Sequence, residues 1–167
     1  NPVANRGRST PIFKALQGIL KRKGINHSYH FTDYPGHATE ITSEITADDS
    51  VDTIFVVGGD GTYNEVVNGS INSEIPLGLL PGGSCNDFIK DIGEWKDFNS
   101  FLNAVIKGKT RTVDTGMVNR RVFLNNMGVG FDAQVIEDMI KKNLKSNLGY
   151  VIMVMRNLFQ FNDFDAS

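Results

Sequence analysis

The sequence is poor in the residues that build disulfides and metal centres, because its 167 residues include one cysteine, one tryptophan and three histidines. The single cysteine, Cys85, excludes an internal disulfide and is typical of a protein in a reducing cytosol. No spacing of cysteine and histidine indicates a zinc site. The formal net charge of −2 gives no electrostatic reason to expect nucleic acid as a partner. These absences predict a cytoplasmic protein without a disulfide, a zinc site or a nucleic-acid partner.

A membrane-spanning run is also missing. The segment 149–161 is apolar with helical spacing, but it is too short to span a bilayer. It predicts a helix in the core, with a helix on a membrane-facing surface as the alternative. No signal peptide, repeat or low-complexity segment is visible. The chain opens at Asn1-Pro2 without an initiator methionine or an apolar strand, and we expect residues to precede Asn1.

Helical and strand patterns alternate in the first part of the chain. Hydrophobic residues make up 40% of the sequence and glycine occurs 17 times, which is typical of a soluble α/β protein with many turns. Strand patterns occur at 25–32, 53–57 and 75–80. Helical patterns lie before, between and after them, at 10–23, 37–46 and 98–107. This alternation predicts an open, mostly parallel sheet with right-handed crossovers over residues 1–109.

The pattern changes after residue 109. The segments 110–118 and 121–127 are rich in β-forming residues, and Asn119-Arg120 between them is typical of a hairpin turn. A helix is predicted to follow, up to about Leu144. We therefore predict that residues 110–167 form the beginning of a second, β-rich domain that is incomplete here.

The most informative stretch, residues 56–65, reads Val-Val-Gly-Gly-Asp-Gly-Thr-Tyr-Asn-Glu and joins a buried strand to a short helix. An open α/β sheet binds its ligand at this position, at the carboxyl end of a strand. Glycine lets the backbone approach a phosphate, and the following helix offers free N–H groups and a positive dipole end. A carboxylate beside phosphates repels them unless a cation bridges the two, so Asp60 predicts Mg²⁺. The alternative is that Asp60 is a helix N-cap in a tight turn, but a cap does not need three glycines.

A second glycine loop follows the next strand, at residues 81–87. Ser84 offers a hydroxyl for a phosphate, Asn86 an amide and Asp87 a carboxylate. The alternative is a capped turn in which Asp87 begins a short helix at 88–90. Because both loops follow strands, we predict that they flank one crevice.

These motifs resemble a known family. Residues 58–62, Gly-Gly-Asp-Gly-Thr, look like the nucleotide-binding signature of the diacylglycerol kinase catalytic-domain family, which includes bacterial lipid kinases and sphingosine kinases. Residues 81–88 are similar to its Pro-x-Gly-Thr-x-Asn-Asp-Phe motif, with Ser84 in place of Thr. Asn1-Pro2 resembles the family's opening loop, without the Ser-Gly or Ala-Gly that usually follows, and Thr32 with 36–38 resembles its Thr…Gly-His-Ala segment. Asp114 and the segment 125–133 match its entry into the second domain.

The resemblance implies an ATP-dependent lipid kinase with a nucleotide-binding fold like that of NAD kinases and phosphofructokinases. The reaction would transfer the γ-phosphoryl group of Mg·ATP to a lipid hydroxyl, with diacylglycerol as the preferred acceptor. The residues expected at the nucleotide are Asn1, Pro2, Arg6, Thr32, Gly58, Gly59, Asp60, Gly61, Thr62, Asn64, Glu65, Gly83, Ser84 and Asn86.

Catalytic roles are expected for four residues. Asp60 would organise Mg²⁺ directly or through water, and Asp87 and Asp114 would extend the acidic network. Lys90 stands where the family usually has arginine, and together with Arg6 it would neutralise developing charge. The family's general base is an acidic residue late in the second domain. No matching motif is visible, so we expect the base outside this chain.

Two other functions stay open. One is a NAD kinase-like or other small-molecule kinase of the same fold, and the other is a nucleotide-binding module without turnover. The expected partners are ATP, a lipid substrate and the surface of the inner membrane face. A homodimer is the alternative to a monomer.

Overall fold

The computed structural model describes residues 1–93, 97–142, 144 and 147–158. The chain divides into two compact units, Asn1–Asn125 and Asn126–Ser167. The β-rich segment predicted to open a second domain at residue 110 thus lies in the first unit up to Asn125. The domain boundary at 109 stays a prediction.

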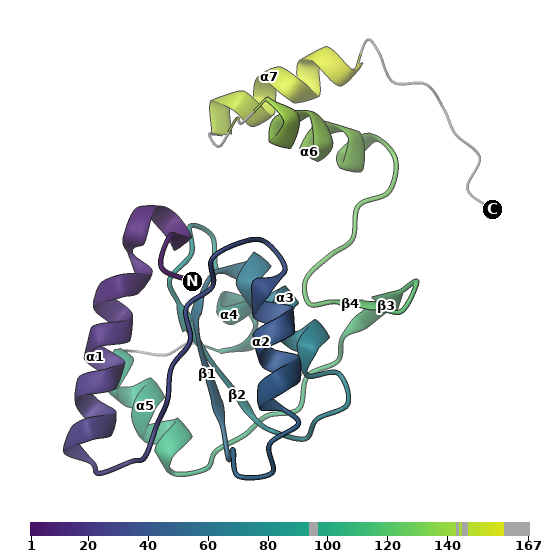
Figure 1. Ribbon diagram of the computed structural model, residues 1–167. Helices are drawn as coiled ribbons and strands as arrows, with labels where there is room; N and C mark the ends of the chain where they lie inside the picture. The colour runs from purple at the N-terminus through teal and green to yellow at the C-terminus, as the bar shows by residue number, and fades with distance from the viewer. Residues whose placement is uncertain (94–96, 143, 145–146, 159–167) are drawn as a thin grey trace. The chain divides into compact units, whose positions relative to one another are not determined.

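A parallel pair of strands forms the centre of the first unit (Figure 1). Strand β1 is Ile54–Gly58 and strand β2 is Leu77–Pro81, and their register runs from Ile54 opposite Leu77 to Gly58 opposite Pro81. Both strands are almost wholly apolar, as expected for parallel strands that are covered on both faces. Their carboxyl ends lie at the same edge and lead into the two glycine loops.

Helices cover both faces of this pair. On one face, α1 (Ser9–Arg22) and α5 (Phe98–Ile106) bring Leu16, Leu20 and Phe101 against Leu80. On the other face, the elements are α2 (His37–Ile45), α3 (Asp60–Gly69) and α4 (Asp87–Ile92). Their core is formed with residues of both strands and consists of Ala38, Val56, Tyr63, Val66, Leu79, Phe88 and Ile89. The predicted α/β architecture with a parallel sheet is therefore confirmed. A 3-10 turn, η1 (Ala4–Gly7), precedes α1.

The strand predicted at 25–32 is wrong. The segment is extended, but it joins neither of the sheets formed by the described residues. Its only described backbone-to-backbone hydrogen bond is from Ile25 N to Leu20 O at 3.0 Å, which closes the end of α1. Alternation of side chains needs only an extended backbone, whereas a strand also needs a hydrogen-bonding neighbour about 4.8 Å away. The segment has the first property and lacks the second.

The predicted hairpin is present, with shorter strands. Strand β3 (Gly116–Val118) pairs antiparallel with β4 (Arg121–Phe123), and the turn residues Asn119 and Arg120 both have positive φ, at 46° and 64°. Such a turn matches the twist of the two strands. Asn68 of α3 fixes the hairpin, since its amide donates to Val122 O and accepts from Val122 N, each at 2.9 Å.

The described residues of the second unit form a pair of helices, α6 (Phe131–Lys141) and α7 (Asn147–Leu158). Val135 and Met153 are buried, and the Asn157 amide donates to Asp138 Oδ2 at 3.1 Å. The predicted core helix lies in α7 up to Leu158, and its remaining residues, 159–161, fall outside the described part. Several apolar side chains of α7 are exposed, namely Tyr150, Val151, Ile152, Met155 and Leu158. Within the described residues, no helix combines the length and the apolar character needed to traverse a bilayer.

Candidate functional site

The two glycine loops touch each other at the carboxyl edge of the strand pair. A Cβ built on Gly83 would lie 2.4 Å from Gly59 Cα, and one built on Gly59 would lie 2.8 Å from Gly83 Cα. Gly82 N also donates to Gly58 O at 2.6 Å. The contact requires glycine on both sides, and it confirms the expectation that the two loops flank one place in the fold.

Helix α3 begins directly after β1 and directs its amino end to this edge. Its N-cap is Gly59, and the first intrahelical bond runs from Tyr63 N to Gly59 O at 3.0 Å. The N–H groups of residues 60–62 therefore have no partner within the helix. A Cβ on Gly61 would meet nothing within 4 Å, and φ of Gly61 is not positive. Neither crowding nor backbone conformation in the described structure requires glycine at position 61.

A cavity of about 320 Å³ lies in front of this helix end. It brings together half of the residues predicted at the nucleotide, namely Asn1, Thr32, Gly59, Gly61, Thr62, Glu65 and Gly83. Five further lining residues were not predicted, namely Val3, Ala4, Asp33, Tyr34 and Pro35. The lining does not include the other predicted residues, which are Pro2, Arg6, Gly58, Asp60, Asn64, Ser84 and Asn86.

Asp60 connects the two loops. Its Oδ1 accepts a hydrogen bond from Phe88 N at 3.0 Å, in the first turn of α4, and lies 3.5 Å from Asn125 Nδ2. The sequence alternative made Asp60 the cap of its own helix, whereas the carboxylate caps the helix that follows the second loop. Both of these hydrogen bonds end on Oδ1, and a carboxylate has lone pairs on two oxygens. Among the described residues, no group of three or more Asp, Glu, His or Cys side chains gathers to hold a metal.

Side-chain amides hold the second loop. Asn86, at φ 54°, accepts from Gly83 N through Oδ1 and donates to Gly83 O through Nδ2, both at 2.9 Å. Asn5 of the opening loop also donates to Gly83 O, at 3.1 Å. Ser84 is exposed. The predicted site residue Asn86 thus shapes the loop, and its two amide atoms are already bonded within the protein.

The opening loop is attached to the first glycine loop. The Asn1 side chain donates to Thr62 Oγ1 at 3.2 Å, and Ser9 Oγ donates to Asn1 O at 2.6 Å. Asn1 therefore lies beside the glycine signature, and its contact with the nucleotide stays a prediction. Arg6 is exposed, with φ 56°, and its side chain forms no hydrogen bond or ion pair with the described residues.

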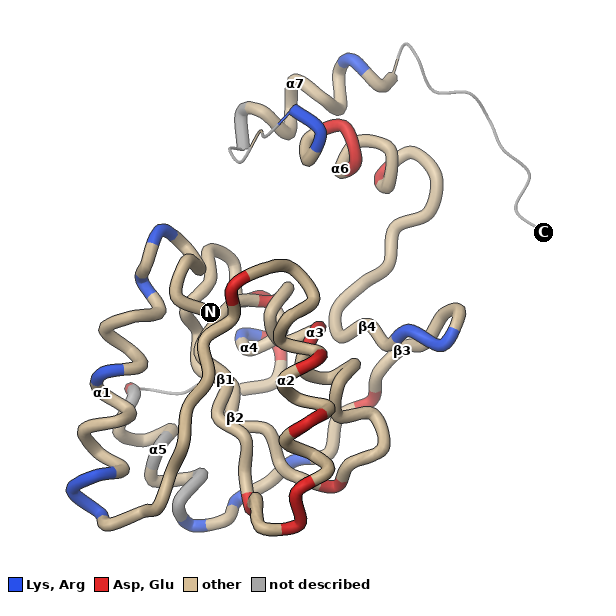
Figure 2. Tube along the Cα trace, viewed as in Figure 1, with Lys and Arg blue, Asp and Glu red and all other residues tan. Residues whose placement is uncertain are grey.

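The two charged residues of α4 pair with each other. Lys90 Nζ lies 3.0 Å from Asp87 Oδ1, and both side chains are exposed. The hydrogen bond to Asp87 raises the pKa of Lys90, with further attraction from Asp87, Cys85 and Asp60. Asp114 is exposed in the segment before β3. Figure 2 shows Asp and Glu gathered over α2 and α3, and Lys and Arg along α1, so the first unit carries both signs of charge.

Three residues that support the site were not predicted to do so. The Tyr63 hydroxyl lies 2.8 Å from Gly58 O and 2.7 Å from Leu80 O, at the ends of both strands, and burial raises its pKa. Asn125 reaches Asp60, as described above. Glu65, predicted at the nucleotide, lines the cavity but accepts from Ala38 N at 3.2 Å and so caps α2. Apart from the contact between Tyr63 and Gly58, these contacts join residues that are distant along the chain, so they have no signature in the sequence.

Comparisons with known proteins identify a matching family and similar sequences. Residues 1–118 match the family described as "Diacylglycerol kinase catalytic domain". The chain is 32% identical over 170 residues to "Putative lipid kinase YtlR" of Bacillus subtilis (strain 168), covering 95% of this chain and 54% of that protein. It is 33% identical over 158 residues to a "Putative lipid kinase" of Staphylococcus aureus (strain Mu3), covering 90% of this chain and 52% of the relative. The chain thus spans about half the length of these curated relatives.

Two solved structures are also similar to this chain in fold and in sequence. A "putative diacylglycerol kinase from Bacillus anthracis str. Sterne" superposes with a TM-score of 0.63 at 33% identity, covering 84% of this chain and 50% of that one. A second crystal structure with that description gives a TM-score of 0.52 at 36% identity, covering 62% of this chain and 38% of the other. By its matched residues and its fold, the chain belongs to the diacylglycerol kinase catalytic domain family.

Proposed function

We propose that this chain supplies the ATP-binding half of a lipid kinase that phosphorylates diacylglycerol or a related lipid alcohol. The observation that carries the proposal is the cavity at the amino end of α3, where both glycine loops, Asn1 and Thr32 meet. The position is the ligand site of open parallel sheets, and the unpaired N–H groups of a helix end attract phosphate. The family relationship supports a kinase with a lipid acceptor.

In this proposal the phosphates lie against Gly61 and the first turn of α3. Gly61 has open space in front of it, so a phosphate approaches the backbone closely there. The first turn of α3 stabilises the negative charge through its N–H groups and its dipole. Thr62 is held by Asn1 and lines the same cavity, where its hydroxyl is oriented toward the opening loop.

Asp60 is the residue that we propose for Mg²⁺. Its carboxylate is fixed by Phe88 N on Oδ1, which leaves lone pairs on Oδ2 for a metal-bound water or the ion itself. One carboxylate together with substrate phosphates is a common donor set for this ion, which neutralises the charge of the transferred group. Lys90, with a raised pKa, keeps its positive charge at neutral pH, and it would have to leave Asp87 to reach a phosphate.

The first test is binding of Mg·ATP to residues 1–167, measured by calorimetry with and without Mg²⁺. We expect weak binding that depends on Mg²⁺ and is reduced in Gly61→Ala. Binding that is equal without Mg²⁺ and unchanged in this variant would contradict the placement of the phosphates.

The second test is the acceptor. The full-length protein would be offered diacylglycerol, a sphingoid base and NAD with labelled ATP. We expect label in the diacylglycerol product and little in the others. Label in NAD alone would make the chain a NAD kinase-like enzyme, and binding without transfer to any acceptor would leave a nucleotide-binding module. Residues 1–167 alone are expected not to phosphorylate lipid. Turnover by this chain would place the general base within it, with Asp132 the first residue to exchange.

A further inference from the structure

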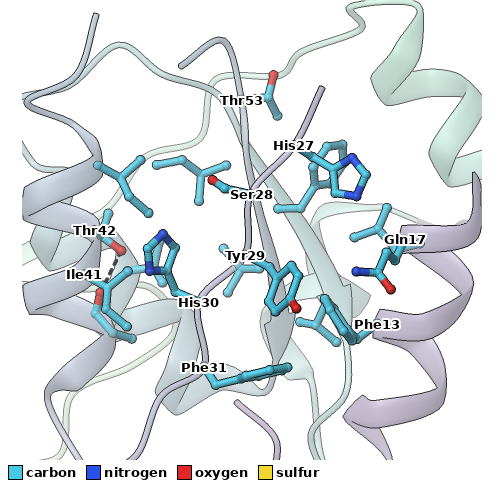
Figure 3. Close-up of a pocket in the computed structure, with 18 of the residues that line it drawn as sticks. Phe13, Gln17, His27, Ser28, Tyr29, His30, Phe31, Ile41, Thr42 and Thr53 are labelled. Carbon is cyan, nitrogen blue, oxygen red and sulfur yellow. Dashed lines mark hydrogen bonds between the residues drawn. The ribbon is translucent and has the colours of Figure 1, made fainter. Parts of the chain in front are cut away.

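The opening loop, residues 1–8, forms one wall of the smaller cavity, the one beside the glycine loops. A larger cavity of about 1060 Å³ lies among β1, α1, α2 and the extended segment that joins the two helices. Figure 3 shows Phe13 of α1 at one side of this larger cavity and Ile41 of α2 at the other. Val3 and Ala4 line the smaller cavity and do not line the larger one. The position of the opening loop therefore shapes the smaller cavity.

The opening loop contains a left-handed turn. Asn5 has φ 45° and ψ 51°, Arg6 has φ 56° and ψ 35°, and Gly7 has φ 89°. Glycine adopts this conformation freely and asparagine visits it more readily than most residues, whereas arginine has a steric cost there. The Arg6 side chain forms no hydrogen bond or ion pair with the described residues that would offset this cost. The turn therefore depends on contacts made by its neighbours.

One hydrogen bond fastens this turn to the second glycine loop. Asn5 Nδ2 donates to Gly83 O at 3.1 Å. Within the described part of the chain, no other hydrogen bond joins residues 4–7 to a residue beyond α1. Gly83 O also accepts from Asn86 Nδ2 at 2.9 Å, and a carbonyl oxygen has lone pairs for both donors. The Asn86 bond lies within the second loop, whereas the Asn5 bond joins that loop to the opening loop.

The opening loop is fastened at its other end to α3. The Asn1 amide donates to Thr62 Oγ1 at 3.2 Å, in the first turn of that helix. Val3 and Ala4 lie between the two attachments, and Thr62 and Gly83 line the same cavity. The walls of the smaller cavity are thus bonded to one another before a ligand enters. A preformed cavity lowers the free energy that binding loses to ordering the protein.

We propose that Asn5 is a positioning residue for the nucleotide, because its amide holds the left-handed turn against Gly83 and so keeps the walls of the smaller cavity in place for Mg·ATP. The inference rests on the proposed function, which puts the phosphates in this cavity. Asparagine combines the two properties that the position needs, since it tolerates the turn and carries a donor for a carbonyl. Glycine would have the first property alone.

The test compares Asn5→Gly with a matched control in residues 1–167. Asn5→Gly keeps the left-handed turn and removes the amide. The control is Asn119→Gly, because Asn119 has nearly the same φ, 46°, is exposed in the hairpin turn and lines neither cavity. Hydrogen exchange of peptides that cover the opening loop and residues 81–87 is measured without nucleotide and with saturating Mg·ATP. Calorimetry gives the Kd for Mg·ATP, and thermal unfolding gives the stability.

We expect Asn5→Gly to speed exchange in both peptides and to raise the Kd for Mg·ATP about fivefold, the scale of one net hydrogen bond. Saturating Mg·ATP should return both peptides to the wild-type exchange rate, since the bound nucleotide contacts the same walls. The Asn119→Gly control should change neither quantity. A raised Kd with an unchanged midpoint of thermal unfolding separates positioning from a general loss of stability.

Three results would overturn the proposal. They are unchanged exchange of residues 81–87 in Asn5→Gly, faster exchange with an unchanged Kd, and equal effects in the Asn119→Gly control. If Asn5→Gly does not fold, Asn5→Asp replaces it and is judged by exchange, since aspartate tolerates the turn but its ionised carboxylate cannot donate to Gly83 O. Absence of Mg·ATP binding by the wild-type chain would contradict the proposed function, and exchange would still decide whether Asn5 joins the two loops.

Discussion

The two glycine-rich loops end neighbouring parallel strands, yet they use glycine for different reasons. In the loop after β2, Gly83 is pressed against Gly59 and is bonded through its N–H and C=O to the Asn86 amide. After β1, by contrast, Gly61 lies in the first turn of α3 and has nothing within 4 Å of the place where a Cβ would stand. The second loop is therefore a wall shaped by contacts within the protein, whereas the first loop opens on a cavity.

The difference in crowding between Gly83 and Gly61 distinguishes a glycine that the fold requires from one that faces a ligand. A glycine that the fold itself requires shows a close neighbour or a positive φ, and Gly83 has the first of these. A glycine with neither property, such as Gly61, is explained by something that approaches from outside. The predictions below test this division of roles between the loops, beginning with the largest expected effect.

Asp60→Asn should lower lipid phosphorylation by the full-length protein about 10²–10³-fold, the cost typical of removing one group that stabilises developing charge. Stability should change little, because Asn keeps an oxygen in the position that accepts from Phe88 N. Activity and thermal unfolding are measured together. Activity within a few-fold of wild type would contradict the metal role, and Asp60→Ala, which loses the bond to Phe88, is the control for the structural contribution.

Gly83→Ala should destabilise the first unit by about 1–3 kcal/mol, the usual cost of overpacking. A methyl group there would lie 2.4 Å from Gly59 Cα, which is backbone and cannot rotate away. Denaturant unfolding of residues 1–167 measures the change. An unchanged midpoint would show that the two loops separate easily, and the second loop would then not be a fixed wall.

Gly61→Ala is the matched substitution in the open loop. It should leave stability equal or raise it by about 0.5–1 kcal/mol, since alanine is the better helix residue and has room. Affinity for Mg·ATP should fall about tenfold, equivalent to about 1.4 kcal/mol. Calorimetry and unfolding on the same preparation check both statements. A variant that unfolds more easily and binds normally would reverse the roles of the two loops.

Tyr63→Phe should lower stability by about 1 kcal/mol, the net value of one buried hydrogen bond. It should also reduce the loss of stability at alkaline pH. Burial raises the pKa of Tyr63 in the folded protein above its unfolded value of 10.0, so the stabilisation is complete below pH 10 and declines as pH rises above it. Unfolding curves between pH 8 and about 11 test this, and parallel profiles for the two proteins would contradict it.

Lys90→Ala should reduce turnover of the full-length protein a few-fold, and Lys90→Arg should retain or exceed the wild-type rate because Arg adds a bidentate fork for phosphate. Both variants should fold normally, since Lys90 is exposed and pairs only with exposed Asp87 in the described structure. Steady-state kinetics separate the variants. Identical rates for Ala and Arg would make Lys90 a solvated surface residue.

Sequence patterns identified the elements of the site correctly wherever the cause was local. Glycine and asparagine at a turn specify backbone conformations by themselves, so Asn119-Arg120 was recognised as a hairpin turn and residues 81–87 as a loop after a strand. Residues 58–62 were recognised as a connection from a strand to a helix, although α3 already begins at Asp60. The contact between Gly59 and Gly83 was expected only as two loops at one crevice. The role of Asp60 as the cap of α4, and the bonds of Asn125 and Tyr63, join residues that are far apart in the chain.

The sequence by itself determined the α/β alternation, the two phosphate-type loops and the family, because periodicity and loop composition act over a few residues. The tertiary structure decided which glycines are crowded, which polar atoms of the site are already bonded, and that residues 26–32 are not a strand. The physical reason is that a strand and a crowded contact are properties of pairs of segments. Residues 26–32 have the side-chain pattern of a strand. Within the described part of the chain they lack the hydrogen-bonded neighbour that only the fold can supply.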